Sequence, residues 1–391
     1  MEKKYNNLKY KKILVLQNSG VIGGAEKNLE RWIDYFYEKY NISVYMCGPG
    51  KGTFFDEMAS KGIRIIRTNL PEWRKGKNFI YRYLVRSRIT TTLLREEPFD
   101  LIFSNDFFYA PYAVYFGKKL NIPVVVHIQS DCEPKRIHQY SLDRVEGVII
   151  TTKSSYKKIN PYFKPDVLTR IPYGVEIPPK ISTFDRQFRK NPKNFVFGVA
   201  ANLLPHKGID FVFKLASSLI ATQGWEIHWV GGDPQGLGEK FNSKVKQLGL
   251  EDRLFYHGFY KDMDIYYKSI DCLIHPAQYE PFGIVLIEAM SHGLPVISTC
   301  TKGGFEVIGD IDEGNWIVGL DGWAQMAELM KEVMNSRENI RRFGQKFEEK
   351  YQKEFLFSQS MEKLEILFSN IFLRNSKALG QKCFSFLDQG Q

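Results

Sequence analysis

Two glutamates, Glu280 and Glu288, have the spacing in this 391-residue chain that most clearly indicates chemistry. Pro281-Phe282-Gly283 lies between them, and the following residues, Ile284 to Met290, are apolar apart from Glu288. A helix without a polar face belongs inside a protein, where a carboxylate without partners is costly. The start of such a helix offers backbone N–H groups and a positive dipole end, which together favour an anionic ligand.

A ligand that carries both a diphosphate and a ribose fits this arrangement. If the diphosphate meets the N–H groups of Phe282, Gly283 and Ile284, Glu288 lies roughly 7 Å further along the helix axis, near the ribose hydroxyls. Glu280 would then face the group attached to the far phosphate. The alternative is that Glu280 only caps the helix and Glu288 pairs with a lysine or arginine. Two glutamates that bracket Pro-Phe-Gly favour a single binding site.

The stretch from Glu280 to Glu288 resembles the Glu-x7-Glu signature of retaining, nucleotide-sugar-dependent glycosyltransferases of the GT-B fold, the family 4 group. The resemblance extends from about Lys12 to Phe372 and is stronger in the second half of the chain. Further matching residues are Gly258-Phe259, Ala289-Met290, Gly293, Pro295-Val296, Gly303-Gly304 and Glu306.

The resemblance implies roles for individual residues. Glu288 would hold the ribose and Glu280 the sugar hydroxyls, while the backbone near Gly258 and Phe259 would meet the base. Lys207 and the N–H groups of Phe282, Gly283 and Ile284 would hold the departing diphosphate. Gly23 and Gly24 would belong to a loop that closes over the donor phosphate. Catalysis would then come from positioning and charge stabilisation, and we predict Glu280, His127 and Lys207 as the catalytic residues.

One position departs from the family pattern Gly-Arg-Leu-x-x-x-Lys-Gly. Here the chain reads Asn202-Leu203-Leu204-Pro205-His206-Lys207-Gly208, so Lys207 matches but Asn202 replaces the arginine. Asn202 can donate hydrogen bonds to the donor but brings no charge. We therefore expect weaker stabilisation of the leaving diphosphate.

The first part of the chain predicts a second phosphate-facing loop. A buried strand, Lys12 to Gln17, precedes glycines at 20, 23 and 24 and a periodic helix that reaches about Tyr40. The spacing matches neither the dinucleotide Gly-x-Gly-x-x-Gly nor a Walker loop, which disfavours a nicotinamide enzyme. His127 ends the apolar run Val124 to Val126, and the family often has a histidine there that contacts the donor sugar.

Alternating strand and helix patterns predict an α/β fold with parallel sheets. By resemblance this is GT-B: two doubly wound, Rossmann-like domains that face a cleft, with a C-terminal helix crossing back to the first domain. We expect an acceptor-side domain at 1–178, a linker at 179–194, a nucleotide-sugar domain at 195–354, the returning helix at 355–372 and a loose tail at 373–391.

Composition limits the partners. The net charge of +10 favours an anionic partner, and the absence of a zinc, RRM or helix-turn-helix signature argues against nucleic acid. The basic, aromatic stretch 73–88 fits a helix on anionic lipid and fits equally an ordinary packed helix. Scattered cysteines and the lack of a signal peptide predict a cytoplasmic protein, and the lipid-facing alternative for 73–88 would associate it with the cytoplasmic membrane face.

The sequence therefore predicts a hexosyltransferase (EC 2.4) that uses a UDP- or GDP-sugar and a glycan or lipid-linked acceptor in surface polysaccharide or lipopolysaccharide synthesis. We expect no cofactor and no metal, because Asp262-Met263-Asp264 reads as the start of a helix rather than a metal motif. The alternatives are a non-catalytic sugar-nucleotide-binding subunit, which Asn202 favours, and a phosphorylase or epimerase of the same fold.

Overall fold

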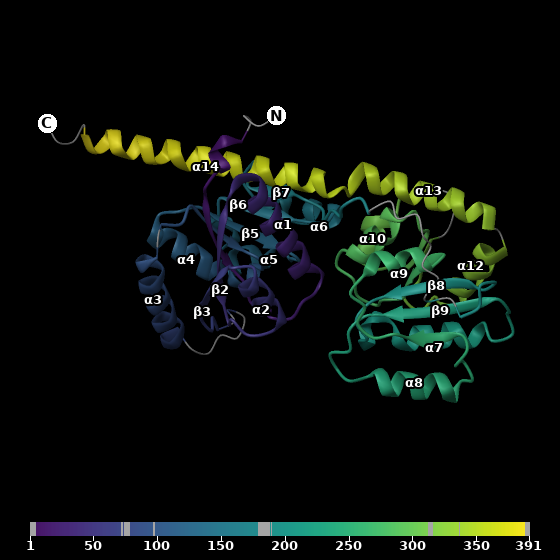
Figure 1. The fold of residues 1–391 in the computed structure, drawn as a ribbon. Helices are drawn as coiled ribbons and strands as arrows, with labels where there is room; N and C mark the ends of the chain where they lie inside the picture. Colours follow the sequence, from purple (N-terminus) through teal and green to yellow (C-terminus); the bar gives the residue numbers. More distant parts are fainter. Residues whose placement is uncertain are drawn as a thin grey trace. The chain divides into compact units, whose positions relative to one another are not determined.

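The computed structural model describes residues 5–71, 73, 79–96, 98–178, 188, 190–311, 316–335 and 337–387. The chain divides into two compact units, each built on one sheet of parallel strands (Figure 1). Unit 1 comprises Met1–Pro172 with Ser360–Gln391, and unit 2 comprises Tyr173–Gln359. The two parallel α/β units confirm the predicted fold class.

The sheet of unit 1 has the order β3-β2-β1-β4-β5-β6-β7 in the described residues, and all its strand pairs are parallel. The strands are β1 Lys12–Leu16, β2 Ser43–Gly48, β3 Arg64–Arg67, β4 Leu101–Ser104, β5 Val124–Ile128, β6 Gly147–Ile150 and β7 Leu168–Arg170. The order reverses between β1 and β4. In open parallel sheets, such a switch point is where ligands bind, at the carboxyl ends of the strands.

Helices cover both faces of this sheet, and its central strands β4 and β5 are buried at every residue and mostly apolar. The helices are α1 Gly24–Tyr40, α2 Thr53–Ser60, α3 Phe79–Arg95, α4 Ala110–Leu120, α5 Lys135–Gln139, α6 Lys153–Ile159 and α14 Phe357–Leu387, with short 3₁₀ turns η1 Asn6–Leu8, η2 Phe107–Tyr109, η3 Leu142–Arg144 and η4 Asn160–Tyr162.

The sheet of unit 2 has the order β10-β9-β8-β11-β12-β13 in the described part of the chain. Its strands are β8 Phe195–Ala200, β9 Trp225–Val230, β10 Leu254–Tyr256, β11 Cys272–His275, β12 Val296–Thr299 and β13 Ile317–Val318. Its helices are α7 Ile209–Ser218, α8 Gly238–Gln247, α9 Met263–Ser269, α10 Ile284–Ser291, α11 Lys302–Ile308, α12 Trp323–Asn335 and α13 Arg337–Glu354, with the 3₁₀ turn η5 Pro205–Lys207. The switch point here lies between β8 and β11.

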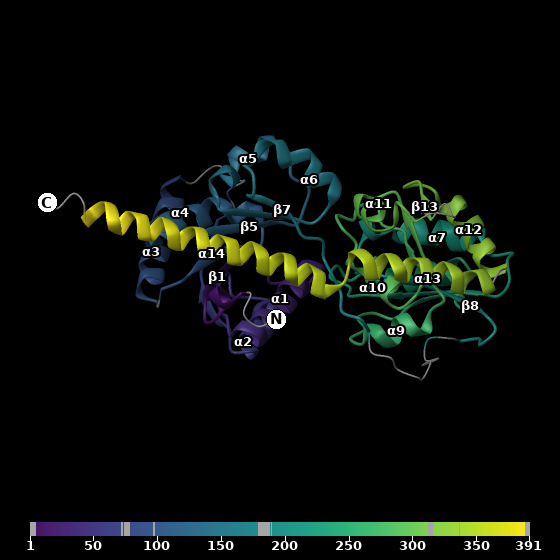
Figure 2. The same cartoon turned by 90° about the horizontal axis from the view of Figure 1, so that it is seen from above.

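Helix α14 buries one apolar face between Phe357 and Phe372. Within unit 1 it crosses over β1 and β5 (Figure 2), where the ring of Phe368 packs against Phe36 at 5.4 Å and Phe103 at 6.3 Å between centroids. A side chain at Gly147 would meet Ile371 at 2.9 Å, so the helix sits close to β6. The helix runs to Leu387, beyond Phe372, where the sequence predicted that it would end.

Two predicted segments fall largely outside the described residues. Of the expected linker 179–194, only Phe188 and residues 190–194 are described, and Phe188 is buried against His257 at 4.8 Å. Of the expected lipid-facing stretch 73–88, residues 74–78 lie outside the description, as do the side chains of 79–84. Among the described helices, none is both long and apolar enough to cross a membrane.

Candidate functional site

The centre of the site is the turn that joins β11 to α10 in unit 2. Strand β11 is buried along its length and ends at His275. Gly283 has φ +88°, a left-handed conformation that glycine adopts without steric cost, and it caps α10, which begins at Ile284. The predicted apolar helix is therefore present, and its first turn has backbone N–H groups without an acceptor inside the helix.

Glu280 lies in this turn and contacts two cationic or potentially cationic groups. Its Oε2 accepts a hydrogen bond from Lys207 Nζ at 2.7 Å and lies 3.5 Å from His275 Nε2. Its Oε1 accepts from the Gly283 N–H at 3.1 Å. Burial would raise the pKa of this carboxyl, but His275 and Lys207 outweigh burial and hold the pKa at about 2. Glu280 is therefore ionised at neutral pH.

Backbone contacts bring Lys207 to Glu280. Lys207 ends η5, after β8, and the following Gly208 has φ +93°. A side chain at Gly208 would stand 2.2 Å from the Pro276 carbonyl oxygen, and the Gln278 N–H donates to the His206 carbonyl at 2.9 Å. The loops after β8 and β11 are thus joined across the switch point of the sheet, where the fold favours ligand binding.

Gly303, in the first turn of α11 after β12, contacts the same turn. Its N–H donates to the Glu280 carbonyl at 2.8 Å, and a side chain there would stand 2.6 Å from the Phe282 carbonyl. The Phe282 ring is buried and packs edge-on against Tyr173 at 5.1 Å. Phe282 can therefore offer a ligand its backbone, whereas its ring anchors the turn in the core.

Glu288 lies in the middle of α10 and is half-buried. The Tyr267 hydroxyl donates to Glu288 Oε2 at 3.0 Å, which satisfies part of the hydrogen-bonding capacity of this carboxylate. The predicted ribose contact requires the remaining capacity, since a carboxylate has several acceptor positions.

Three further predicted residues lie at the carboxyl edge of the same sheet. Asn202, at the family's arginine position, accepts a hydrogen bond from the Gly232 N–H at 3.0 Å and so joins the loops after β8 and β9. Gly258 follows β10 with φ +73° and accepts from the Gly231 N–H at 2.8 Å. The neighbouring Phe259 is 77% exposed, so its ring projects into solvent.

Asp262, the first residue of the Asp-Met-Asp sequence, caps the start of α9 by accepting from the Ile265 N–H at 3.3 Å. Asp264 lies 3.1 Å from His292 Nε2. Within the ranges that the structure describes, no group of three or more His, Cys, Asp or Glu side chains is arranged to hold a metal ion.

In unit 1, the glycine loop is tied to its sheet by a chain of amide hydrogen bonds. Gln129 Nε2 donates to Asn105 Oδ1 at 2.6 Å, and Asn105 Nδ2 donates to Gln17 Oε1 at 2.8 Å. Gln17 Nε2 donates to Glu26 Oε1 at 3.2 Å, and Glu26 Oε2 accepts from the Gly23 N–H at 3.1 Å. The chain follows the ends of β5, β4 and β1 to the start of α1, where Gly24 is the first helical residue.

His127, which the sequence predicted to contact the donor sugar, is a buried residue of unit 1. It lies inside β5 on the face covered by α1, because side chains alternate along a strand and Val125 and His127 share that face. Its ring stacks on Trp32 at 5.1 Å, and the residue is 1% exposed. Burial lowers the pKa of His127 to about 3, so the ring is neutral.

Sequence reasoning missed His275 and the Gln129–Asn105–Gln17 chain. Each of these residues is the last of a buried strand or follows directly after it. Polar residues at the carboxyl ends of apolar runs are the available signal: Gln129, two residues after the buried His127, follows the end of β5.

Part of the chain is similar in sequence to known glycosyltransferases, and its fold is similar to that of solved structures. Residues 180–350 match the family model described as Glycosyl transferases group 1. The lipopolysaccharide core biosynthesis mannosyltransferase LpsB of Rhizobium meliloti (strain 1021) is 28% identical over 154 residues, which are 38% of this chain and 43% of that protein. The uncharacterized glycosyltransferase YqgM of Bacillus subtilis (strain 168) is 24% identical over 263 residues, 64% of this chain and 72% of that protein.

Among solved structures, Anabaena Alr3699/HepE in complex with UDP and glucose shares the fold. The TM-score is 0.74 at 18% identity, and the match covers 92% of this chain and 100% of that chain. The segment aligned with LpsB covers less than half the length of that protein.

Proposed function

We propose that this chain, which has the GT-B fold and whose residues 180–350 belong to the glycosyl transferases group 1, moves a sugar from a nucleotide diphosphate to a hydroxyl acceptor. The observation that carries the proposal is the Lys207–Glu280 pair at the start of α10, across the switch point of the unit 2 sheet. A cation and a helix N-terminus, which suit a diphosphate, lie there beside an ionised carboxylate, which suits the hydroxyl groups of a sugar.

The diphosphate would bind Lys207 and the first turn of α10. An ammonium group has several N–H donors, so Lys207 can hold Glu280 and a phosphate oxygen together. Because Glu280 already occupies the Gly283 N–H, the diphosphate would use the other N–H groups of that turn. Lysine and the helix dipole would supply positive charge to the leaving group, which is why we propose metal-independent transfer.

Glu280 would bind sugar hydroxyls rather than move protons. A carboxylate whose pKa is about 2 is a weak base at neutral pH. In the proposed step, the bond from the anomeric carbon to the phosphate oxygen breaks and a bond to the acceptor oxygen forms on the same face. The departing diphosphate takes the acceptor's proton, and the anomeric configuration is retained.

Glu288 would hold the ribose, and the turn around Gly258 would approach the base. Two similar proteins support the donor and the setting: HepE was crystallised with UDP and glucose, and LpsB acts in lipopolysaccharide core biosynthesis. We therefore propose a UDP- or GDP-hexose donor and a glycan or lipid-linked acceptor of the cell surface.

The test is product analysis with the purified chain in excess EDTA. UDP-glucose, UDP-galactose and GDP-mannose are each offered with lipopolysaccharide core acceptors, and the anomeric proton coupling of the product is read by NMR. The proposal expects transfer with retention that Glu280→Gln strongly reduces. An inverted product, or transfer that EDTA abolishes, would contradict the mechanism.

A second candidate, a non-catalytic subunit that binds the sugar nucleotide, rests on Asn202. This residue contacts the Gly232 backbone and brings no charge where the family has arginine. Asn202→Arg separates the candidates: binding without turnover in the wild-type chain, with turnover gained by the variant, would favour the subunit. Turnover by the wild-type chain alone would exclude it.

A further inference from the structure

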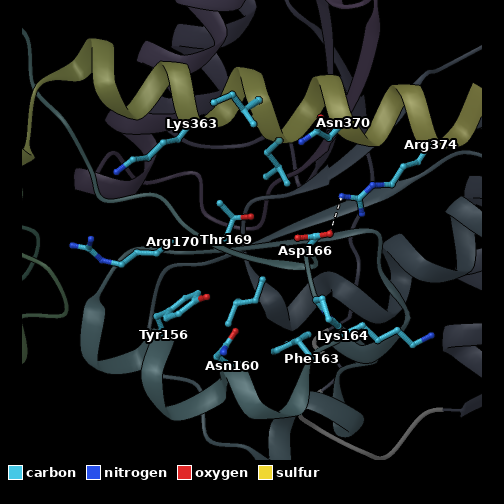
Figure 3. A pocket seen from close by; sticks show the side chains of 14 residues that line it. Tyr156, Asn160, Phe163, Lys164, Asp166, Thr169, Arg170, Lys363, Asn370 and Arg374 are labelled. Atoms are coloured by element: carbon cyan, nitrogen blue, oxygen red, sulfur yellow. Dashed lines mark ion pairs between the residues drawn. The ribbon is translucent and has the colours of Figure 1, made fainter.

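Unit 1 contains a pocket of about 710 Å³ beside the edge strand β7 (Figure 3). Helix α14 lines one side of it and the α6–η4 segment lines the opposite side. The α14 residues are spaced so that they share one face of the helix; they are Lys363, Ile366, Leu367, Asn370 and Arg374. The volume falls within the range of small-molecule sites in proteins.

The pocket is strongly positive. Lys164, Arg170, Lys363 and Arg374 line it against the single carboxylate of Asp166, four cations to one anion. In Figure 3, Lys363 and Arg374 reach down from α14, with Arg374 paired to Asp166, whereas Arg170 and Lys164 extend toward opposite edges of the pocket. Arg374 lies 3.9 Å from Asp166, but the side chains are 53% and 79% exposed, so the pair neutralises little of the charge. A concave surface of one sign concentrates ligands of the opposite sign.

The remaining lining adds hydrogen-bond donors and apolar surface. Asn160, Asn370 and Thr169 supply amide and hydroxyl groups, while Tyr156 and Phe163 from the α6–η4 segment supply ring surface. Guanidinium groups match phosphate oxygens with two parallel hydrogen bonds, and lysines bind them as point charges. Cations, amide donors and apolar surface together suit a phosphate group that is attached to an organic residue.

We propose that this pocket binds a phosphate ester, carried either by a soluble metabolite or by a phospholipid headgroup. All of its lining residues belong to unit 1, and none belongs to the donor site of unit 2. Binding of a phosphate ester in this pocket can therefore be tested independently of the proposed glycosyl transfer.

The test uses the full chain and a matched pair of double variants. Lys363→Gln/Arg374→Gln removes two exposed cations from the pocket, and Lys118→Gln/Lys119→Gln removes two exposed cations from the end of α4. Circular dichroism and thermal melting confirm that each variant folds. Glycerol 3-phosphate titration by NMR measures the soluble source. Sedimentation with vesicles of phosphatidylcholine, with and without phosphatidylglycerol, measures the lipid source.

We expect the pocket variant to weaken at least one of the two interactions roughly tenfold, with the α4 variant close to wild type. Loss of glycerol 3-phosphate binding alone identifies a soluble ligand, and loss of binding to phosphatidylglycerol vesicles identifies a lipid headgroup. Absence of both interactions in the wild-type chain overturns the proposal. Equal losses in the two variants also overturn it, since net charge would then explain the binding.

Discussion

Replacing Lys207 with methionine removes the positive charge of the proposed donor site while keeping an unbranched apolar stem. The ammonium group contacts Glu280 Oε2 at 2.7 Å, and its stem lies in a loop fixed by Gly208 and Pro276. In the variant, Glu280 keeps His275 at 3.5 Å and the Gly283 N–H at 3.1 Å. The turn should therefore hold its shape, and the change should act mainly on an incoming diphosphate.

The expected loss follows from one charge-assisted hydrogen bond. Such a bond to a charged group contributes about 1.5–3 kcal/mol, so the nucleotide diphosphate should bind about 10- to 150-fold more weakly. In the variant, Glu280 also loses its closest cation and would repel the diphosphate. We therefore expect a loss of affinity toward the upper end of this range. Isothermal titration of the diphosphate that binds wild type measures the ratio directly.

Lys214→Met is the matched control, because Lys214 is an exposed lysine on α7 of the same unit. It should bind the diphosphate as wild type does. If Lys207→Met folds normally and binds the diphosphate with unchanged affinity, the assignment of Lys207 to the leaving group is refuted.

Three further outcomes follow from the same geometry. Glu288→Gln should weaken the binding of UDP more than that of an analogue without ribose hydroxyls, as measured by titration. Equal losses of affinity would contradict the proposed contact between Glu288 and the ribose. Gly303→Ala should destabilise the fold by about 1–3 kcal/mol in urea unfolding, because its Cβ meets the Phe282 carbonyl at 2.6 Å, whereas Gly319→Ala, with space around it, should not. The pKa of Glu280 is about 2 in the folded chain, whereas its ordinary value is 4.5. The ionised carboxylate therefore stabilises the fold fully above pH 4.5, and this stabilisation is lost as the pH falls toward 2. Between pH 4.5 and pH 2, the free energy of unfolding of the wild type should fall by on the order of 3 kcal/mol relative to that of Glu280→Gln. If the two proteins lose stability in parallel over this range, the pairing of Glu280 with Lys207 and His275 is contradicted.

The fold was predictable because apolar runs and helical periods alternate along the chain. The run of apolar residues that forms β8, for example, indicates a strand that is buried on both faces, as in a parallel sheet covered by helices. The end of α14 was not predictable in this way. Its apolar face packs on strands that are distant in the sequence. The helix also continues beyond Phe372, where the apolar pattern of the sequence becomes irregular.

The core of the unit 2 site was predictable from one local motif, because Glu280, Gly283 and Glu288 lie in a single turn and helix. Lys207 was placed by resemblance, and the structure brings it to Glu280. In unit 1 the sequence did not show that His127 is buried, since a shift of two residues along a strand separates a buried core position from the end of the strand. Only the register of β5 against β4 and β6 identifies which residue reaches the edge.

The most direct test of the central claim is a thermal-shift panel of UDP, GDP, ADP and CDP in EDTA, repeated with magnesium. Ligand at about 100 times its dissociation constant should add about 2.7 kcal/mol of stability. We predict that one diphosphate stabilises the wild-type chain equally with and without the metal, and that Lys207→Met loses most of this shift. No shift with any diphosphate, or a shift that requires magnesium, would contradict the proposed donor site.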